Sequence, residues 1–317
     1  MRGHRRASVA VGDTTRPATV RRVTTNQDPW ARWLLQRRDA GDVQVRQHGT
    51  AQLAAYRDGV LDRAAVTDGD VLLDVGTGDG LIGFAALDRV GRSGQVIFSD
   101  ISADLLAGCR RRAAREGLLE RCRFVQTGAD DLRGVADQSV DVVTTRSVLI
   151  YVARKQAAFA EFFRVLRPGG RLSIFEPINN FTMTHAGDDL FGLDLAAVAD
   201  LAAKVCRAYL GVPTEQDPML NFDERDLLRW ARGADFAALE LDYRAEVEVP
   251  EPLPTTDWEV LKKTAPNPLA PTYEEALAQT LTRAERDRFE NHVHTVLAAG
   301  TPARKTLATA YLRAIRP

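Results

Sequence analysis

The stretch Leu73-Asp74-Val75-Gly76-Thr77-Gly78-Asp79-Gly80 decides the fold class of this chain. The apolar run 71–75 is typical of a buried parallel strand, and residues 80–90 have the spacing of a helix. Glycines between a strand and a helix let the backbone turn tightly and approach a ligand without an intervening Cβ. We therefore expect a ligand site outside the carboxyl end of this strand.

The segments after this stretch continue to alternate between strand and helix. The turn Arg167-Pro168-Gly169-Gly170 is a sharp stop between the last predicted helix and the last predicted strand of the series. Such an alternation predicts a parallel sheet with helices on both faces, joined by right-handed crossovers. The predicted strands are 71–75, 95–99, 123–126, 140–144 and 171–175, and the predicted helices are 80–90, 102–116 and 155–165.

The regular alternation ends after Pro177. The end of the chain, 306–315, fits a strand or a helix. We expect a strand antiparallel to 239–249, because that strand otherwise lacks a partner. The predicted class is α/β: a Rossmann-like, mostly parallel sheet of seven strands with helices on both faces, plus helical lid or cap segments. The further predicted elements are helices 194–210, 223–232, 272–281 and 283–298 and strand 239–249.

Composition divides the chain further. Residues 1–27 carry six arginines and few large apolar side chains, so we expect a disordered basic arm without a signal peptide. Residues 28–66, with a helix at 49–64, are expected to form a helical lid. The main domain is then 67–317, with substrate-cap insertions at about 178–220 and 250–298.

The charge balance excludes several classes of partner. The formal net charge is −1, so we expect no nucleic acid or anionic membrane as partner. No run of about 18 apolar residues predicts a membrane span. The three cysteines have no metal-like spacing, which favours reduced thiols in a cytoplasmic protein and no metal site. A homodimer is left open.

The glycine pattern discriminates between two ligand classes. A dinucleotide fingerprint needs a third glycine where this chain has Leu81. The acidic Asp79 in the same turn also suits a pyrophosphate poorly. S-adenosylmethionine carries no phosphate but a sulfonium, an ammonium and a carboxylate, so nearby acids are tolerable or useful. This pattern favours S-adenosylmethionine over a nicotinamide dinucleotide.

Asp100 ends the second predicted strand. A carboxylate at this position can accept hydrogen bonds from both ribose hydroxyls of a nucleotide, and Ile101 would offer an apolar surface to adenine. Both nucleotide classes use such a carboxylate, so it does not discriminate between them. The alternative interpretation of Asp100 is a helix-capping aspartate before 102–116.

From about Asp70 to Pro177, roughly a third of its length, the chain resembles the core of a class I S-adenosylmethionine-dependent methyltransferase. The shared pieces are LDVGTGDG, FSDIS, the loop Gly128–Leu132, SVDVVTTRSVLIYV and FFRVLRPGGRLSIFEP.

The resemblance implies a role for each part of the cofactor site. Asp74 and the glycine loop would line the methionine portion, and Asp100 would take the ribose. Ala129, through its backbone, and Asp130 would meet the adenine, because Gly128 replaces the acid that many relatives carry. Arg146 and Ser147 would lie beside the methionine portion and the transferred methyl. The implied cofactor residues are Asp74, Gly76, Thr77, Gly78, Gly80, Asp100, Ile101, Ala129, Asp130, Arg146 and Ser147.

The acceptor side is less defined. Substrate elements in this family lie where this chain has its lid and cap segments, which predicts a closed pocket for a small molecule. Methyl transfer needs a base only if the acceptor must lose a proton. The candidates are His185, Tyr151, Glu176 and His48. The alternatives are a solvated His185, a packing Tyr151, a structural Glu176 and a His48 that belongs to the lid.

The predicted function is methylation of oxygen, nitrogen or carbon on a small molecule, with S-adenosylhomocysteine as product. The arginine and alanine content resembles that of actinobacterial proteins, in which such enzymes tailor natural products. Two alternatives stay open. One is an RNA or protein methyltransferase, and the other is a protein of this fold that binds the cofactor without methylation, as a scaffold, sensor or cyclase.

Overall fold

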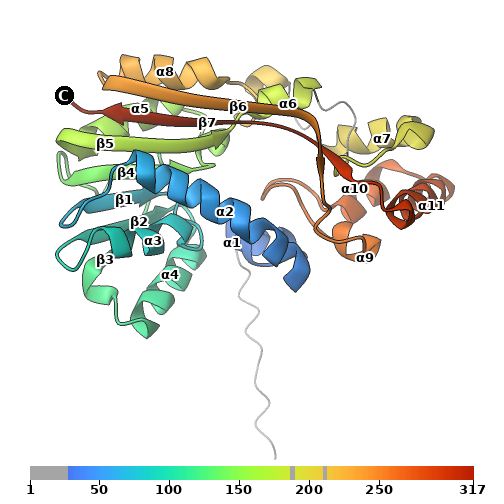
Figure 1. Cartoon of the computed structure of the whole chain (residues 1–317), viewed down its shortest axis with the longest axis horizontal. Coiled ribbons are helices and arrows are strands. Elements are labelled where there is room, and N and C mark those ends of the chain that lie inside the picture. Colours follow the sequence, from blue (N-terminus) through green and yellow to red (C-terminus); the bar gives the residue numbers. More distant parts are fainter. Residues whose placement is uncertain (1–27, 186–189, 210–212) are drawn as a thin grey trace, which may run out of the picture.

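The sheet of this protein has seven strands in the order β3-β2-β1-β4-β5-β7-β6 (Figure 1). The computed structural model describes residues 28–185, 190–209 and 213–317. The first five strands are parallel, and β7 is antiparallel to both of its neighbours. This confirms the predicted α/β class. The strands are β1 (Val71–Val75), β2 (Gln95–Asp100), β3 (Cys122–Gln126), β4 (Val140–Arg146), β5 (Leu166–Pro177), β6 (Ala237–Glu251) and β7 (Ala303–Ile315).

Helices cover both faces of the sheet, and each face has its own apolar core. The first core joins the sheet to α2, α3 and α4, through residues such as Leu61, Ile82 and Leu106. The second joins it to α5 and α8, through residues such as Phe159 and Leu227. These helices are α2 (Val43–Arg63), α3 (Leu81–Arg89), α4 (Ala103–Arg115), α5 (Lys155–Val165) and α8 (Glu224–Gly233).

The last strand, β7, lies between β5 and β6. Its side chains alternate between buried and half-buried positions along most of its length, which is the pattern of a strand with one face in a core. Tyr311 is the register partner of Phe175 on one side and Asp242 on the other. The strand prediction for 306–315 is therefore confirmed, with β5 as a second partner.

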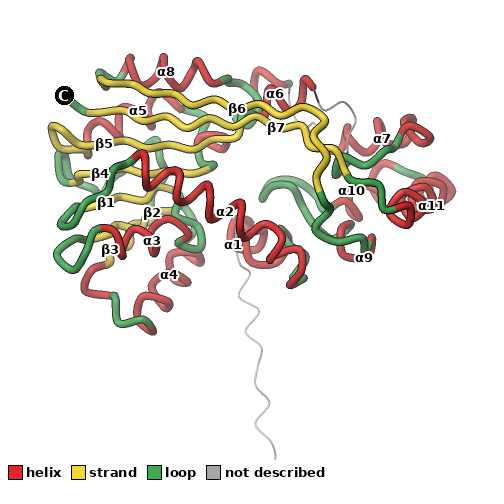
Figure 2. The backbone as a smooth tube through the Cα atoms, in the orientation of Figure 1, coloured by secondary structure: helices red, strands yellow, loops and turns green. Residues whose placement is uncertain are grey.

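A second lobe, the cap lobe, lies beyond the sheet (Figures 1 and 2). Its core takes side chains from both predicted insertions, among them Leu201, Leu277 and Phe289. Strands β6 and β7 continue past β5 as a two-stranded ribbon that reaches this lobe, with an irregularity between Glu246 and Val249. The cap helices are α7 (Ala199–Cys206), α9 (Trp258–Leu261), α10 (Tyr273–Thr280) and α11 (Arg283–Ala299).

Several elements differ from the prediction. The helix predicted at 194–210 is broken into η4, α7 and η5. Helix α2 begins at Val43 rather than near residue 49, because the Asp42 carboxylate caps it by accepting from the backbone of Gln44 and Val45. The basic arm 1–27 lies outside the described residues. The short elements are α1 (Pro29–Arg32), η1 (Trp33–Arg37), η2 (Leu119–Arg121), η3 (Leu149–Tyr151), α6 (Asn179–His185), η4 (Ala196–Val198), η5 (Arg207–Tyr209) and η6 (Thr214–Gln216).

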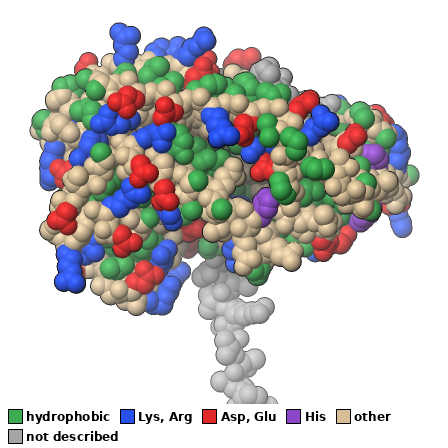
Figure 3. Space-filling view, viewed as in Figure 1, with side chains coloured by type: hydrophobic (Ala, Val, Ile, Leu, Met, Phe, Trp, Pro, Cys, Tyr) green, Lys and Arg blue, Asp and Glu red, His purple; other side chains and the backbone are tan. Residues whose placement is uncertain are grey.

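The surface carries charges of both signs. Figure 3 shows Lys and Arg side chains interspersed with Asp and Glu over both lobes on the face in view. Among the described helices, none has the length and apolar content needed to cross a membrane.

Candidate functional site

The glycine loop between β1 and α3 uses three left-handed residues. Gly76, Gly78 and Gly80 have φ angles of +65°, +59° and +86°. A Cβ on Gly76 would stand 2.3 Å from Val148 Cγ2, and one on Gly80 would stand 2.4 Å from the Phe84 ring. The loop therefore needs glycine both for its backbone conformation and for the close approach of its neighbours.

Asp74 supports this loop from inside the protein. Its Oδ2 accepts hydrogen bonds from Thr77 Oγ1 at 2.6 Å and from the Gly83 backbone N–H at 3.0 Å, and its Oδ1 accepts from Thr144 Oγ1 at 3.1 Å. The residue is 1% exposed, and burial raises the pKa of its carboxyl to about 6. The Asp74 side chain thus holds the loop in place from inside the protein. We expect the backbone of the loop, rather than this carboxylate, to line the methionine portion of the cofactor.

Asp100 links the glycine loop to the start of α4. Its Oδ2 accepts from the Gly78 backbone N–H at 2.9 Å and its Oδ1 from the Ser102 backbone N–H at 2.8 Å. Ser102, not Asp100, caps α4, since its hydroxyl accepts from the Leu105 backbone. Ile101 beside it is 48% exposed, a high value for an isoleucine. An acidic group and an open apolar surface therefore adjoin at the end of β2.

The loop after β3 lies against this surface. A Cβ on Gly128 would stand 3.2 Å from Asp130 Oδ1 and 3.8 Å from Ile101 Cγ2. Ala129 is buried, and Asp130 Oδ2 accepts from Arg154 Nε at 2.9 Å. The loop thus lies next to Ile101 at Gly128, and the Asp130 carboxylate is already paired on one side.

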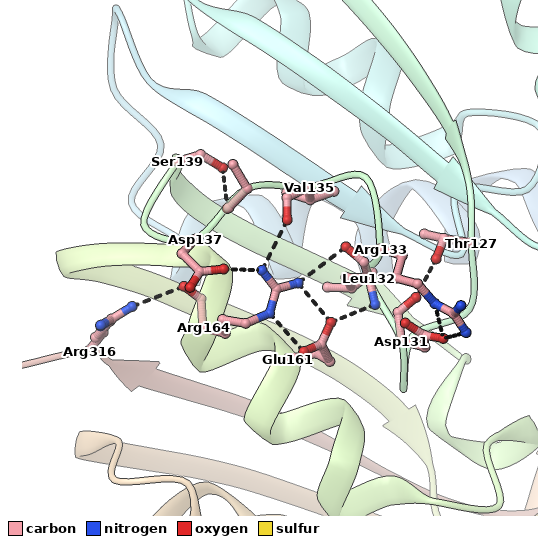
Figure 4. A network of polar contacts seen from close by, with 11 residues as sticks. Thr127, Asp131, Leu132, Arg133, Val135, Asp137, Ser139, Glu161, Arg164 and Arg316 are labelled. Atoms are coloured by element: carbon pink, nitrogen blue, oxygen red, sulfur yellow. Dashed lines mark hydrogen bonds and ion pairs between the residues drawn. The ribbon is translucent and has the colours of Figure 1, made fainter.

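Arg164 of α5 holds the segment that follows this loop (Figure 4). Its guanidinium donates to the backbone carbonyls of Leu132 at 3.2 Å and Val135 at 3.0 Å, and pairs with Glu161 and Asp137. Glu161 in turn accepts from the Leu132 backbone N–H at 2.6 Å. Charged hydrogen bonds from α5 therefore anchor the loop that carries Ala129 and Asp130.

Glu176 shapes the end of β4. Ser147 adopts a left-handed φ of +55°, and the turn after it is held by Glu176, which accepts from the backbone N–H groups of Val148, Leu149 and Ile150 at 2.9, 2.9 and 3.3 Å. The carboxyl is fully buried, and burial raises its pKa to about 7. These contacts favour the structural alternative for Glu176: it positions the turn, and its oxygens face the chain.

Two of the other predicted bases, Tyr151 and His48, have surroundings that the structure describes. Tyr151 packs edge-on against Trp30, with 4.9 Å between ring centroids, and burial raises the pKa of its hydroxyl. Tyr151 is therefore a packing residue. His48 is exposed on α2. His185 ends α6, and its side chain lies outside the described part of the structure.

The cysteines lie on separate elements. Cys109 is buried in α4, with its thiol 3.4 Å from the Gly78 carbonyl, while Cys122 lies on β3 and Cys206 on α7. Within residues 28–185, 190–209 and 213–317, no group of three or more His, Cys, Asp or Glu side chains could hold a metal ion.

The first part of the predicted lid lies over the loop. Residues 28–38, here called the latch segment, reach from the cofactor side to the cap lobe. Asp28 accepts from Ser102 Oγ at 2.6 Å, Leu34 Cδ2 lies 3.2 Å from where a Gly78 Cβ would stand, and Trp33 Nε1 donates to the Ala265 carbonyl at 2.8 Å. The pair Asp28-Pro29, a typical helix start, marks its beginning in the sequence.

The rest of the predicted lid has a different place. Helix α2 packs on the sheet, with Val60 and Leu61 in the core, rather than over the loop. The covering role is thus confined to the latch segment, whose residues 33–37 form a π-helix, a rare conformation frequent at functional sites.

Comparison with known proteins shows which family this chain resembles. Residues 66–219 match a family model described as a methyltransferase domain. The chain is 37% identical over 118 residues to the ubiquinone/menaquinone biosynthesis C-methyltransferase UbiE of Marinomonas sp., which is 37% of this chain and 46% of that protein. It is 36% identical over 115 residues to an arsenite methyltransferase of Halobacterium salinarum, covering 36% of this chain and 29% of that protein. The chain thus spans less than half the length of these relatives.

Solved structures share the fold at low identity. A candidate methyltransferase from Bacillus halodurans superposes with a TM-score of 0.50 at 16% identity, over 83% of this chain and 99% of that one. A candidate methyltransferase of Haloferax volcanii, solved with the activator Trm112, gives a TM-score of 0.51 at 18% identity, over 92% of this chain and 99% of that one. At this identity the likeness extends to the fold.

Proposed function

Because this chain carries a class I S-adenosylmethionine-dependent methyltransferase domain, with S-adenosylmethionine as its cofactor, we propose that it transfers the cofactor's methyl group to a small-molecule acceptor. The observation that carries the proposal is the convergence of three loops. The glycine loop, the end of β2 and the Gly128–Asp130 loop meet at one edge of the sheet, and the latch segment lies against the first of them.

The residues present fit the cofactor. Asp100 is oriented by the backbone N–H groups of Gly78 and Ser102, and each carboxylate oxygen keeps a further lone pair for a ribose hydroxyl. Ile101 would contact one face of the adenine. The backbone of Ala129 and the Asp130 carboxylate would meet its polar edge. The loop from Gly76 to Gly80 would follow the methionine portion.

The chemistry asks little of the protein beyond positioning. S-adenosylmethionine supplies a methyl group bound to a sulfonium sulfur. When the methyl group is transferred, the rest of the cofactor leaves as a neutral thioether. The chain's residues hold the acceptor in line with that group and exclude water. Glu176 and Tyr151 are unsuited as bases in this arrangement. A deprotonated nucleophile or an electron-rich carbon would need no base, whereas an acceptor that must lose a proton would depend on another group, such as His185.

The size of the acceptor follows from what surrounds the site. The latch segment bonds to Ala265 next to the cap lobe, and its Arg37 pairs with Glu275 of α10. Such a cover suits a small molecule better than a folded RNA or protein. The formal net charge of −1 also gives no basic field for a polyanion.

Two measurements test the proposal. Calorimetry should detect S-adenosylhomocysteine binding at or below tens of micromolar, and absence of binding would overturn the proposal. The protein should then transfer label from methyl-labelled S-adenosylmethionine into the low-molecular-weight fraction of an actinobacterial extract. Label confined to precipitable RNA or protein would instead identify a macromolecular acceptor.

A further inference from the structure

Arg146, at the carboxyl end of β4, is a half-buried cation without a carboxylate partner. Its polar contact is a long hydrogen bond, 3.4 Å, to Ser147 Oγ. In the described parts of the chain no carboxylate lies within ion-pair distance of its guanidinium, whereas most arginines around it are paired. Burial lowers the pKa of Arg146, which shows how far the group is removed from water.

A second cation, Arg38, belongs to the latch segment, in which Leu34 lies against the glycine loop. Arg38 follows η1 and is half-buried, and its charge further lowers the pKa of Arg146. The preceding residue, Arg37, pairs with Glu275, but Arg38 has no such partner among the described residues. The acids that attract Arg146 are Asp79, which is exposed, and Asp74 and Glu176, whose oxygens are engaged by donors of the chain.

Arg146 also adjoins an aromatic wall. Its register partner on β5 is Phe175, which stacks on Tyr56 of α2 at 4.2 Å and lies 4.9 Å from the ring of Tyr311 on β7. The charge of Arg146 acts on both tyrosine hydroxyls, so the three aromatic residues and the guanidinium share one neighbourhood.

This arrangement is costly unless an anion completes it. Burying a guanidinium costs free energy unless an anion pairs with it. Repulsion between two nearby guanidinium groups raises that free-energy cost. A carboxylate or phosphate matches the planar donors of arginine and can bridge two of them. The missing partner is thus an anionic ligand.

The place of Arg146 in the sheet indicates which ligand. Arg146, expected beside the methionine portion and the transferred methyl, lies on β4 between β5 and β1, the strand that leads into the glycine loop. The expected ribose and adenine contacts lie farther along the sheet, at β2 and β3, so Arg146 adjoins the end of the cofactor from which the methyl would leave. Resting on the function proposed above, we propose that Arg146 and Arg38 bind a carboxylate or phosphate group of the methyl acceptor, whose apolar or aromatic body lies toward Tyr56, Phe175 and Tyr311.

The test uses matched probes on the full chain saturated with S-adenosylhomocysteine. Benzoate and phenyl phosphate are compared with uncharged benzamide by ligand-observed NMR titration. We expect at least tenfold tighter binding of one or both anions, a loss of that preference in Arg146→Gln, a partial loss in Arg38→Gln, and retention in Arg146→Lys. Arg63→Gln is the control, because Arg63 stacks on Tyr311 but is paired with Asp242.

A second readout needs no ligand. Arg146→Met should raise the melting temperature of the free protein, because it removes an unpaired buried charge; a structural arginine would lower it. Equal binding of anionic and neutral probes, or a preference that survives Arg146→Gln, would overturn the proposal. So would a tenfold loss of S-adenosylhomocysteine affinity in Arg146→Gln, since the anion would then be the cofactor's own carboxylate. Failure of the native chain to bind S-adenosylhomocysteine would instead overturn the proposed function.

Discussion

The carboxyl edge of the sheet has two halves, a cofactor half at β1, β2 and β3 and an acceptor half at β4 and β5. The charged side chains of the two halves differ in whether the chain itself provides their partners. On the cofactor half, Asp74 and Asp100 are satisfied by hydroxyl and backbone N–H donors of the chain itself. On the acceptor half, Arg146 and Arg38 have no carboxylate partner among the described residues. The first half is complete without a ligand, and the second is completed by one.

This difference separates what is general from what is particular in the molecule. The cofactor half is built from residues close in sequence, and it lies within residues 66–219, which the methyltransferase family model matches together with β4 and β5. The acceptor half combines β4 with the latch segment, α2 and β7, which come from opposite ends of the chain. We infer that cofactor binding tolerates little change and that acceptor choice can change without loss of the fold.

The largest effect is expected from Gly76→Ala, which attacks the cofactor half directly. The new Cβ would stand 2.3 Å from Val148 Cγ2, on a residue with φ of +65°. We expect a loss of about 2–4 kcal/mol in the free energy of unfolding, from overpacking plus backbone strain, and no measurable S-adenosylhomocysteine binding. Chemical denaturation and calorimetry would measure both.

Gly169→Ala is the matched control for that substitution. Gly169 has a similar φ of +78°, but a Cβ added there would meet no other atom within 4 Å. It should cost only about 1 kcal/mol, from backbone strain, and leave cofactor affinity unchanged. Equal effects of the two substitutions would show that the contact with Val148 does not matter.

A smaller effect is expected for Asp100→Asn. The substitution replaces one acceptor oxygen by an NH2 donor. That donor would point at the N–H of Gly78 or of Ser102, which is also a donor, and it would weaken the contact with the ribose. We expect S-adenosylhomocysteine to bind about 10–100-fold more weakly, equivalent to about 1.4–2.8 kcal/mol. Asp88→Asn, an exposed residue of α3, is the control, and an unchanged dissociation constant for Asp100→Asn would remove the ribose role.

Glu176→Gln tests the turn that joins the two halves. The amide cannot accept all three backbone N–H groups, so the free energy of unfolding should fall by about 1–3 kcal/mol at pH 8. Glu240→Gln, an exposed partner of Arg313, should have almost no effect.

The same residue predicts a pH dependence. Burial raises the pKa of Glu176 from 4.5 to about 7 in the folded state, so proton binding by the folded protein adds stability that is full below about pH 4.5 and is lost as pH rises to about 7. The three backbone hydrogen bonds to the carboxylate remain above that pH. Between these values the native protein should lose stability relative to Glu176→Gln. If the free energy of unfolding changed with pH in the same way in both proteins, the pKa of Glu176 would not be raised.

The smallest effect is expected for Asp28→Ala in the latch segment. It removes the cap of α1 and the hydrogen bond from Ser102 Oγ, at a cost of about 1 kcal/mol. Cofactor dissociation should become a few-fold faster in stopped-flow experiments, because one end of the cover is released. A dissociation rate equal to that of the native protein would show that the latch segment does not retain the cofactor.

The sequence predicted the strands and the glycine loop of the cofactor half well because their signals are local. The strand, the three glycines and Asp100 occur within 28 residues, from Leu73 to Asp100, and their order follows from the parallel sheet. The assignment of 306–315 as a strand succeeded for another reason, since 239–249 needed a partner.

The acceptor half was less predictable because its contacts join distant residues. Contacts between residues far apart in the sequence produce no periodic pattern that could predict them. Examples are the contact of Trp33 with Ala265 and the contacts of Phe175 with Tyr56 and Tyr311. Glu176 illustrates the same limit: an acid at a strand end predicts catalysis or bracing equally well, and only its three backbone donors decide.

The most direct test of the account is a crystal structure of the full chain with S-adenosylhomocysteine. We expect the ribose hydroxyls at Asp100, the adenine against Ile101 and the loop at Gly128, and the sulfur open toward Arg146. A nucleoside bound elsewhere, or a sulfur directed away from β4, would contradict the assignment of the two halves.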